Sequence, residues 1–122
     1  MSKNVKKLFN EKVSNIYQKY LDKWNNMSKE ELIENAGDIA VVRITAKALK
    51  EWEVEEDMEY LMRFTDPIWV VGDIWREGID FGNLYIHGNF DDVVSAMRED
   101  GYAEEQYELE PEYVKDKIVQ MM

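Results

Sequence analysis

Carboxylate side chains are the groups in this 122-residue chain whose number and spacing most readily suggest chemistry. Glu55 and Glu59, and likewise Glu104 and Glu108, stand four residues apart, which would place each pair on one face of a helix. Two such carboxylates could bind a divalent cation or share general acid and base roles. A carboxylate-based, metal-dependent hydrolase is therefore one hypothesis, ranked low because crowded carboxylates usually mark a solvated helix face.

Other catalytic arrangements find little support in the sequence. His87 is the only histidine, and beside Gly88 we interpret it as a surface or turn residue. The chain has no cysteine, no phosphate-binding glycine motif and no paired histidines of the kind that hold zinc. We therefore expect a protein that is not an enzyme and that uses no cofactor or metal.

Two acidic stripes stand out, at residues 51–59 and 99–112. Closely spaced carboxylates resemble the phosphates along a nucleic-acid strand, and tyrosines like those in the second stripe are enriched at protein interfaces. We expect both stripes to face solvent and to form a partner-binding surface. Its predicted residues are Glu55, Glu56, Asp57 and Glu59 in the first stripe, and Glu104, Glu105, Tyr107, Glu108 and Glu110 in the second.

Charge is distributed unevenly along the chain. The formal net charge is −11, with +5 on residues 1–29 and −16 on residues 30–122. Such an acidic body repels a nucleic-acid backbone and attracts basic protein surfaces, so we expect no direct contact with nucleic acid. The alternative is that the acidity is incidental and serves only solubility.

Cellular location is inferred from what the sequence lacks. No uncharged apolar stretch approaches the eighteen residues needed to span a membrane, and the lysine-rich start has no signal-peptide pattern. A chain without cysteine also fits a reducing compartment. We expect a cytoplasmic protein that does not bind membranes.

Hydrophobic periodicity predicts an amphipathic helix over residues 4–25 and a second one starting after Ser28. Ser28 and Glu31 form a capping-box pattern at that start. The second helix should run to about residue 52, although a break near Gly37 or a short strand over residues 39–45, which are rich in β-branched residues, is left open. The residues expected to share one face of this helix are Leu32, Ile33, Ala36, Ile39, Ala40, Arg43 and Ala46.

Further helices are predicted over residues 54–64, from Pro67 to Gly78 with Asp66 as the N-cap, from Asn89 or Asp91 to Gly101, and from Pro111 onward. Gly101 is expected to end its helix in the left-handed conformation. A strand at residues 68–71 is the alternative to the helix there. The four tryptophans are interpreted as core residues. The chain as a whole, 1–122, should form one mainly α domain of about five or six helices, with a possible short β-hairpin near 79–90.

The pattern of these elements resembles an uncharacterised domain family of phages and mobile elements of Gram-positive gut bacteria. The resemblance covers roughly residues 8–78 and departs from the family pattern at Gly37-Asp38, and the acidic part at 99–122 lies outside it. It implies a small helical protein carried on a mobile element and transfers no activity. The matching residues are Ser28, Glu30, Glu31, Leu32, Ile33, Glu34, Ala36 and Ile39 in a first block and Pro67 and Trp75 in a second.

Charge and resemblance together suggest a function. The leading hypothesis is a non-enzymatic phage protein in the host cytoplasm that binds the basic surface of a host nucleic-acid-binding protein and inhibits it by mimicking nucleic acid. Anti-CRISPR or anti-restriction activity would be its concrete form. The main alternative is a structural or regulatory interaction module, and the oligomeric state is left open.

Overall fold

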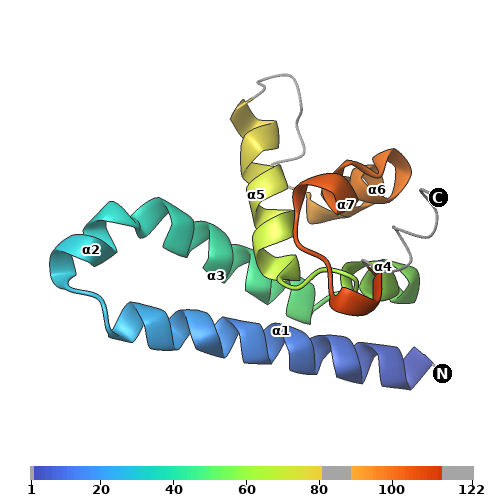
Figure 1. The fold of residues 1–122 in the computed structure, drawn as a ribbon, viewed down its shortest axis with the longest axis horizontal. Helices are drawn as coiled ribbons and strands as arrows, with labels where there is room; N and C mark the ends of the chain where they lie inside the picture. The colour runs from blue at the N-terminus through green and yellow to red at the C-terminus, as the bar shows by residue number, and fades with distance from the viewer. Residues whose placement is uncertain (1, 81–88, 114–122) are drawn as a thin grey trace.

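The structure is a computed structural model that describes residues 2–80 and 89–113, and it confirms a small, mainly α domain (Figure 1). The possible hairpin falls largely on residues 81–88, outside the described part of the chain, and its flanking residues Asp80 and Phe90 are helical. The helices are α1 (Ser2–Asn25), α2 (Lys29–Glu34), α3 (Ala36–Lys50), α4 (Glu55–Leu61), α5 (Pro67–Asp80), α6 (Phe90–Asp100) and α7 (Tyr102–Gln106).

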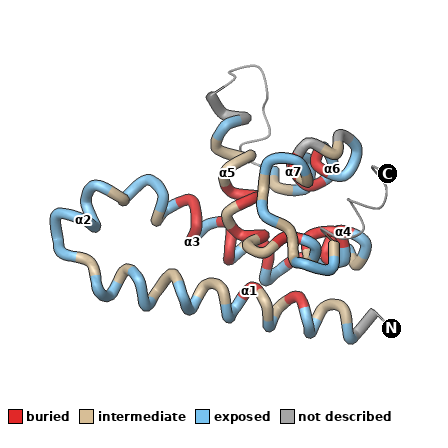
Figure 2. Tube along the Cα trace, viewed as in Figure 1, coloured by how far each residue is buried: buried red, intermediate tan, exposed pale blue. Residues whose placement is uncertain are grey.

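The molecule consists of a packed body and a helical arm (Figure 1). The arm is formed by the second half of α1 together with α2 and the start of α3, which turn back along α1. Figure 2 shows that buried residues concentrate where α3, α4, α5 and α6 meet, whereas the arm is mostly exposed. The most deeply buried large side chains include Phe9, Leu49, Met58, Leu61, Phe64 and Ile68.

The capping box at Ser28 is confirmed. The Ser28 hydroxyl accepts a hydrogen bond from the Glu31 backbone N–H at 3.1 Å, and the Glu31 carboxylate accepts one from the Ser28 N–H at 3.1 Å. These bonds lower the pKa of Glu31, because they stabilise its charged form. Local sequence therefore identified this helix start correctly.

The predicted second helix breaks at Asn35 into α2 and α3, close to Gly37, where a break was left open. Its predicted face is not the buried one, since Leu32 and Ile33 are 36% and 67% exposed. The reason is tertiary: α3 packs against both α1 and α5, so its buried face is the one that meets them. That face consists of Val41, Val42, Thr45, Ala46 and Leu49.

Both segments with a strand alternative are helical, since residues 39–45 lie in α3 and residues 68–71 in α5. Asp66 caps α5 by accepting a hydrogen bond from the Trp69 N–H at 2.9 Å. The helix continues past Gly78 to Asp80, beyond its predicted end. Gly101, with a left-handed φ of 72°, ends α6 as expected.

The tryptophans are less buried than predicted. Trp52 is 6% exposed and belongs to the core, whereas Trp24, Trp69 and Trp75 pack against the core while remaining partly exposed. The interpretation of all four as core residues is therefore right for Trp52 alone.

Gly72 lets α3 and α5 cross at close range. A Cβ added there would lie 2.8 Å from both Thr45 Oγ1 and Val41 Cγ1, two side chains of the buried face of α3. We expect Gly72→Ala to lower the free energy of unfolding by about 1–3 kcal/mol, because the helices would have to separate. Urea unfolding followed by circular dichroism measures this change.

The control is Gly37→Ala, near the start of α3, where an added Cβ meets nothing within 4 Å. Alanine costs less backbone entropy in a helix, so this change should be neutral or raise stability by up to about 1 kcal/mol. Equal stability of the two variants would show that α3 and α5 do not cross at Gly72 as described.

Candidate protein-binding surface

The two acidic stripes are tied together by a buried carboxylate. Asp57 of α4 is 6% exposed and accepts hydrogen bonds from Trp52 Nε1 at 3.0 Å and from Arg98 Nη1 of α6 at 2.8 Å. Arg98 also approaches Glu56 at 3.5 Å. These carboxylates raise the pKa of Arg98, with the hydrogen bond to Asp57 as the main cause. Asp57 therefore holds α4 to α6.

Tyr60 provides a second link between the stripes. Its hydroxyl donates to the Glu104 carboxylate at 2.5 Å and lies 3.2 Å from the Met97 carbonyl oxygen. Burial raises the pKa of Tyr60, and the bond to Glu104 raises it further, so this hydroxyl stays protonated. Glu104 is only partly exposed as a result, and the expectation that it faces solvent is wrong.

Tyr107 is likewise drawn into the fold. Its side chain is partly buried, and its hydroxyl donates to Asp73 of α5 at 2.8 Å. The expectation that Tyr107 faces solvent is therefore also wrong. The side chain of Tyr102 lies outside the described residues, and Tyr113 is partly buried.

The chain after α7 pairs with the chain after α4. The Thr65 N–H donates to the Glu108 carbonyl at 3.1 Å, and the Glu110 N–H donates to the Arg63 carbonyl at 2.8 Å, on either side of an antiparallel bridge between Phe64 and Leu109. The Glu110 side chain forms an ion pair with Lys12 of α1 at 3.2 Å. This pairing brings the two stripes side by side.

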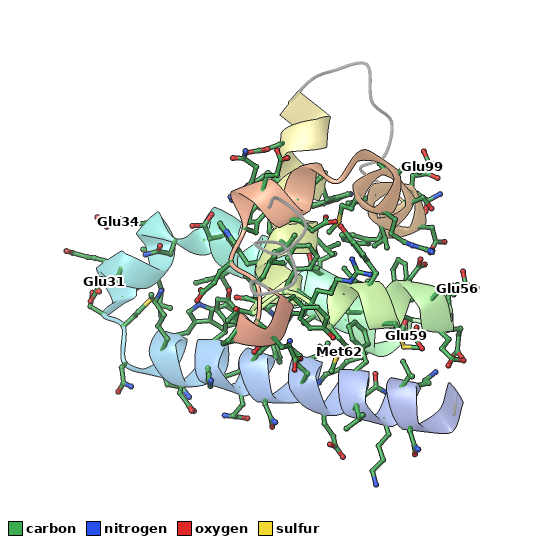
Figure 3. All side chains as sticks on the ribbon, turned by 45° about the vertical axis from the view of Figure 1, so that its right-hand side comes forward. Glu31, Glu34, Glu56, Glu59, Met62 and Glu99 are labelled. Atoms are coloured by element: carbon green, nitrogen blue, oxygen red, sulfur yellow. The ribbon has the colours of Figure 1, made fainter. Side chains whose placement is uncertain are left out.

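We use the name acidic surface for five exposed carboxylates of α4, of α6, of α7 and of the chain directly after α7. Four of the predicted residues are exposed, namely Glu56, Glu59, Glu105 and Glu108, while Glu55 is partly exposed at the start of α4. Glu99 of α6 joins them, although the prediction did not single it out. Figure 3 shows Glu56 and Glu99 at the outer edge of the body, on α4 and α6. The acidic surface consists of Glu56, Glu59, Glu99, Glu105 and Glu108.

The sequence around this surface holds all of the protein's excess charge. Residues 54–64 and 89–113 together carry thirteen acidic and two basic groups, a net charge of −11 that equals that of the whole chain. The rest of the chain carries thirteen acidic and thirteen basic groups, so it is neutral as a whole. The fold joins these two segments through the Arg98–Asp57 and Tyr60–Glu104 contacts and the Phe64–Leu109 bridge, so their carboxylates belong to adjoining parts of the structure.

The carboxylate pairs proposed from the sequence as metal ligands are considered next, for the described part of the chain. Glu104, one member of a predicted carboxylate pair, is engaged by Tyr60. Among residues 2–80 and 89–113, no group of three or more histidine, aspartate or glutamate side chains is placed to hold a metal ion. His87, the other catalytic candidate considered, lies outside the described residues.

Three residues that shape the surface were missed by sequence reasoning, namely Trp52, Tyr60 and Arg98. The partners of Tyr60 and Arg98 lie 37 to 44 residues away, so no local pattern marks them. One signal was available, since Arg98 is the only basic residue between positions 89 and 113. A single cation among nine carboxylates is a good candidate for a structural ion pair.

Comparison with known proteins adds no relative, because no protein-family model, no curated protein and no solved structure matches this chain. No described helix is long and apolar enough to cross a membrane. Over residues 2–80 and 89–113, the fold and the surface define a small, mainly helical domain with exposed carboxylates on α4, α6 and α7.

Proposed function

We propose that this protein acts by binding, through its acidic surface, the basic surface of a protein that handles nucleic acid. Binding would place carboxylates where phosphates otherwise lie and would inhibit that protein. Carried on a phage or mobile element, as the family resemblance implies, such an inhibitor would act against CRISPR or restriction enzymes of the host.

The observation that carries the proposal is the joining of the two acidic stripes. Residues 54–64 and 89–113 are separate in the sequence, yet Asp57, Tyr60 and the pairing of Phe64 with Leu109 bring them together. Solubility alone requires only dispersed charge. A fold that uses some carboxylates to assemble a surface from the others supports a binding role.

The alternative function is that of a structural or regulatory interaction module in which the acidic residues take no part in binding. The contacts of Asp57, Glu104 and Glu110 favour this alternative, because these carboxylates stabilise the fold whether or not a partner protein binds. Charge reversal at exposed positions separates the two functions, since it leaves the internal bonds intact.

The test uses the whole protein as an immobilised bait in host lysate. The variant Glu59→Lys, Glu105→Lys, Glu108→Lys changes only exposed side chains of the acidic surface. We expect the parent protein to retain a nucleic-acid enzyme that the variant does not. Duplex DNA should displace that enzyme, and so should salt, because the Debye length falls from about 10 Å at 0.1 M to about 3 Å at 1 M.

The matched control reverses three exposed carboxylates elsewhere, as Glu11→Lys, Glu34→Lys, Glu77→Lys. Its net charge equals that of the test variant, but the acidic surface is intact, so capture should persist. Equal capture by all three proteins, or equal loss from both variants, would contradict binding through the acidic surface and would favour the alternative.

A further inference from the structure

A second candidate site lies away from the acidic surface, at the base of the arm where α1, α3 and α5 meet (Figure 1). A cavity of about 320 Å³ opens there. Pockets of this size accommodate small ligands or the end of a long side chain. Its walls include Tyr20, Trp24 and Trp69, together with the carboxylates Asp38 and Asp66.

Aromatic rings form two sides of the cavity. Tyr20 and Trp24 stand four residues apart on α1 with ring centroids 5.8 Å apart and planes tilted by 36°, and Trp69 lines the cavity from α5. All three side chains are only partly buried. All three pack against the hydrophobic core and keep part of their apolar area exposed.

Two carboxylates and one lysine, Lys23, line the cavity, so the formal charge of its lining is negative. Asp66 accepts hydrogen bonds from the Tyr20 hydroxyl and from the Trp69 N–H, so both of its oxygens have donors. Burial and the bond to Asp66 raise the pKa of Tyr20, which keeps its hydroxyl protonated and its ring neutral. Asp38, whose side chain is 52% exposed, accepts from Arg76.

One of the aromatic rings, that of Trp69, already packs against a cation outside the cavity. The Arg76 guanidinium lies 5.2 Å from the Trp69 ring centroid while it contacts Asp38 and Asp73. Arg76 does not line the cavity itself, whereas Lys23 does so with an exposed side chain. The ring of Trp69 therefore accommodates a delocalised cation in the folded protein.

We propose that this cavity binds a methylated ammonium group. Such a cation is large, weakly hydrated and without strong hydrogen-bond donors, so it gains most from aromatic faces and from nearby negative charge. An unmethylated ammonium needs several acceptors, and both oxygens of Asp66 are already engaged. An anion would meet Asp38 and Asp66. This proposal is independent of the acidic surface and of the function assigned to it.

The probes are choline and Nε-trimethyllysine, which carry the same head group as a free small molecule and as a protein side chain. Binding to the full-length protein is followed by calorimetry and by tryptophan fluorescence, since Trp24 and Trp69 report on the cavity. We expect at least one probe to bind about tenfold more tightly than 3,3-dimethylbutanol, the neutral isostere of choline, because only the cation interacts with the ring quadrupole. The tighter of the two probes identifies the source of the head group.

Variants of two cavity residues test whether the probe binds in this cavity. Asp38→Asn removes one charge at a half-exposed position, and Trp24→Phe keeps a ring of weaker quadrupole, so both should fold and weaken probe binding about three- to tenfold. The matched controls are Asp91→Asn, an exposed carboxylate on α6, and Trp75→Phe, whose ring packs on Phe90 at 5.2 Å outside the cavity. Neither control should change binding.

Two results would overturn the proposal. One is that neither probe binds more tightly than the neutral isostere. The other is that the Asp38 and Trp24 variants bind the probe as the controls do, provided that their circular dichroism matches that of the parent protein.

Discussion

Phe64→Ala is expected to lower the free energy of unfolding by about 3–5 kcal/mol, the largest effect of any single change considered for this protein. Phe64 is fully buried and meets the Tyr60 ring edge-on at 5.5 Å. Its backbone also forms the bridge with Leu109. Removing the ring leaves a cavity where α4 meets the chain after α7. Since domains are stable by only about 5–15 kcal/mol, much of the stability would be lost.

Urea unfolding followed by circular dichroism measures the change, and Val54→Ala is the matched control. Val54 precedes α4 and is 48% exposed, so its truncation should cost less than about 0.5 kcal/mol. If Phe64→Ala were as mild as the control, the core could not extend to the junction that joins the two acidic stripes.

Asp57→Ala is expected to cost about 2–4 kcal/mol. The Trp52 indole N–H, on a side chain that is 6% exposed, would lose its acceptor, and an unsatisfied buried donor is costly. Loss of the Arg98 ion pair adds less, because the Arg98 side chain is 39% exposed and can be rehydrated. The same unfolding measurement applies.

Glu56→Ala is the control next in sequence. Its carboxylate also approaches Arg98, but at 3.5 Å and with a side chain that is 78% exposed, so its loss should cost less than about 0.5 kcal/mol. A double-mutant cycle between Asp57→Ala and Arg98→Ala should give a positive coupling energy, because the two side chains share one bond. Strict additivity would mean that Asp57 does not hold α4 to α6.

Helix starts and ends were largely predictable from the sequence. The Ser28 capping box, the Asp66 cap before Pro67 and the left-handed Gly101 were all identified and are confirmed. Each depends on groups within four residues of one another. The mainly α class was predictable for the same reason, because the apolar residues recur with a helical period.

Burial was less predictable than helix position. The face of Leu32 and Ile33 was expected to point inward, yet α2 has no buried residue and lies in the exposed part of the arm. Trp24 and Trp69 were interpreted as core and instead line a cavity. In both cases the apolar side chain would be more stable when buried, but the sequence does not show whether another element packs over it.

The sequence by itself determined that this protein is helical, that it carries a net charge of −11 and that its carboxylates fall in two stripes. Only the tertiary structure decided which of these carboxylates are left exposed to solvent. Asp57 and Glu104 are held by Arg98 and Tyr60, whereas Glu105 is exposed. The physical reason is that those partners lie 41 and 44 residues away, and chain folding alone brings them within hydrogen-bond distance.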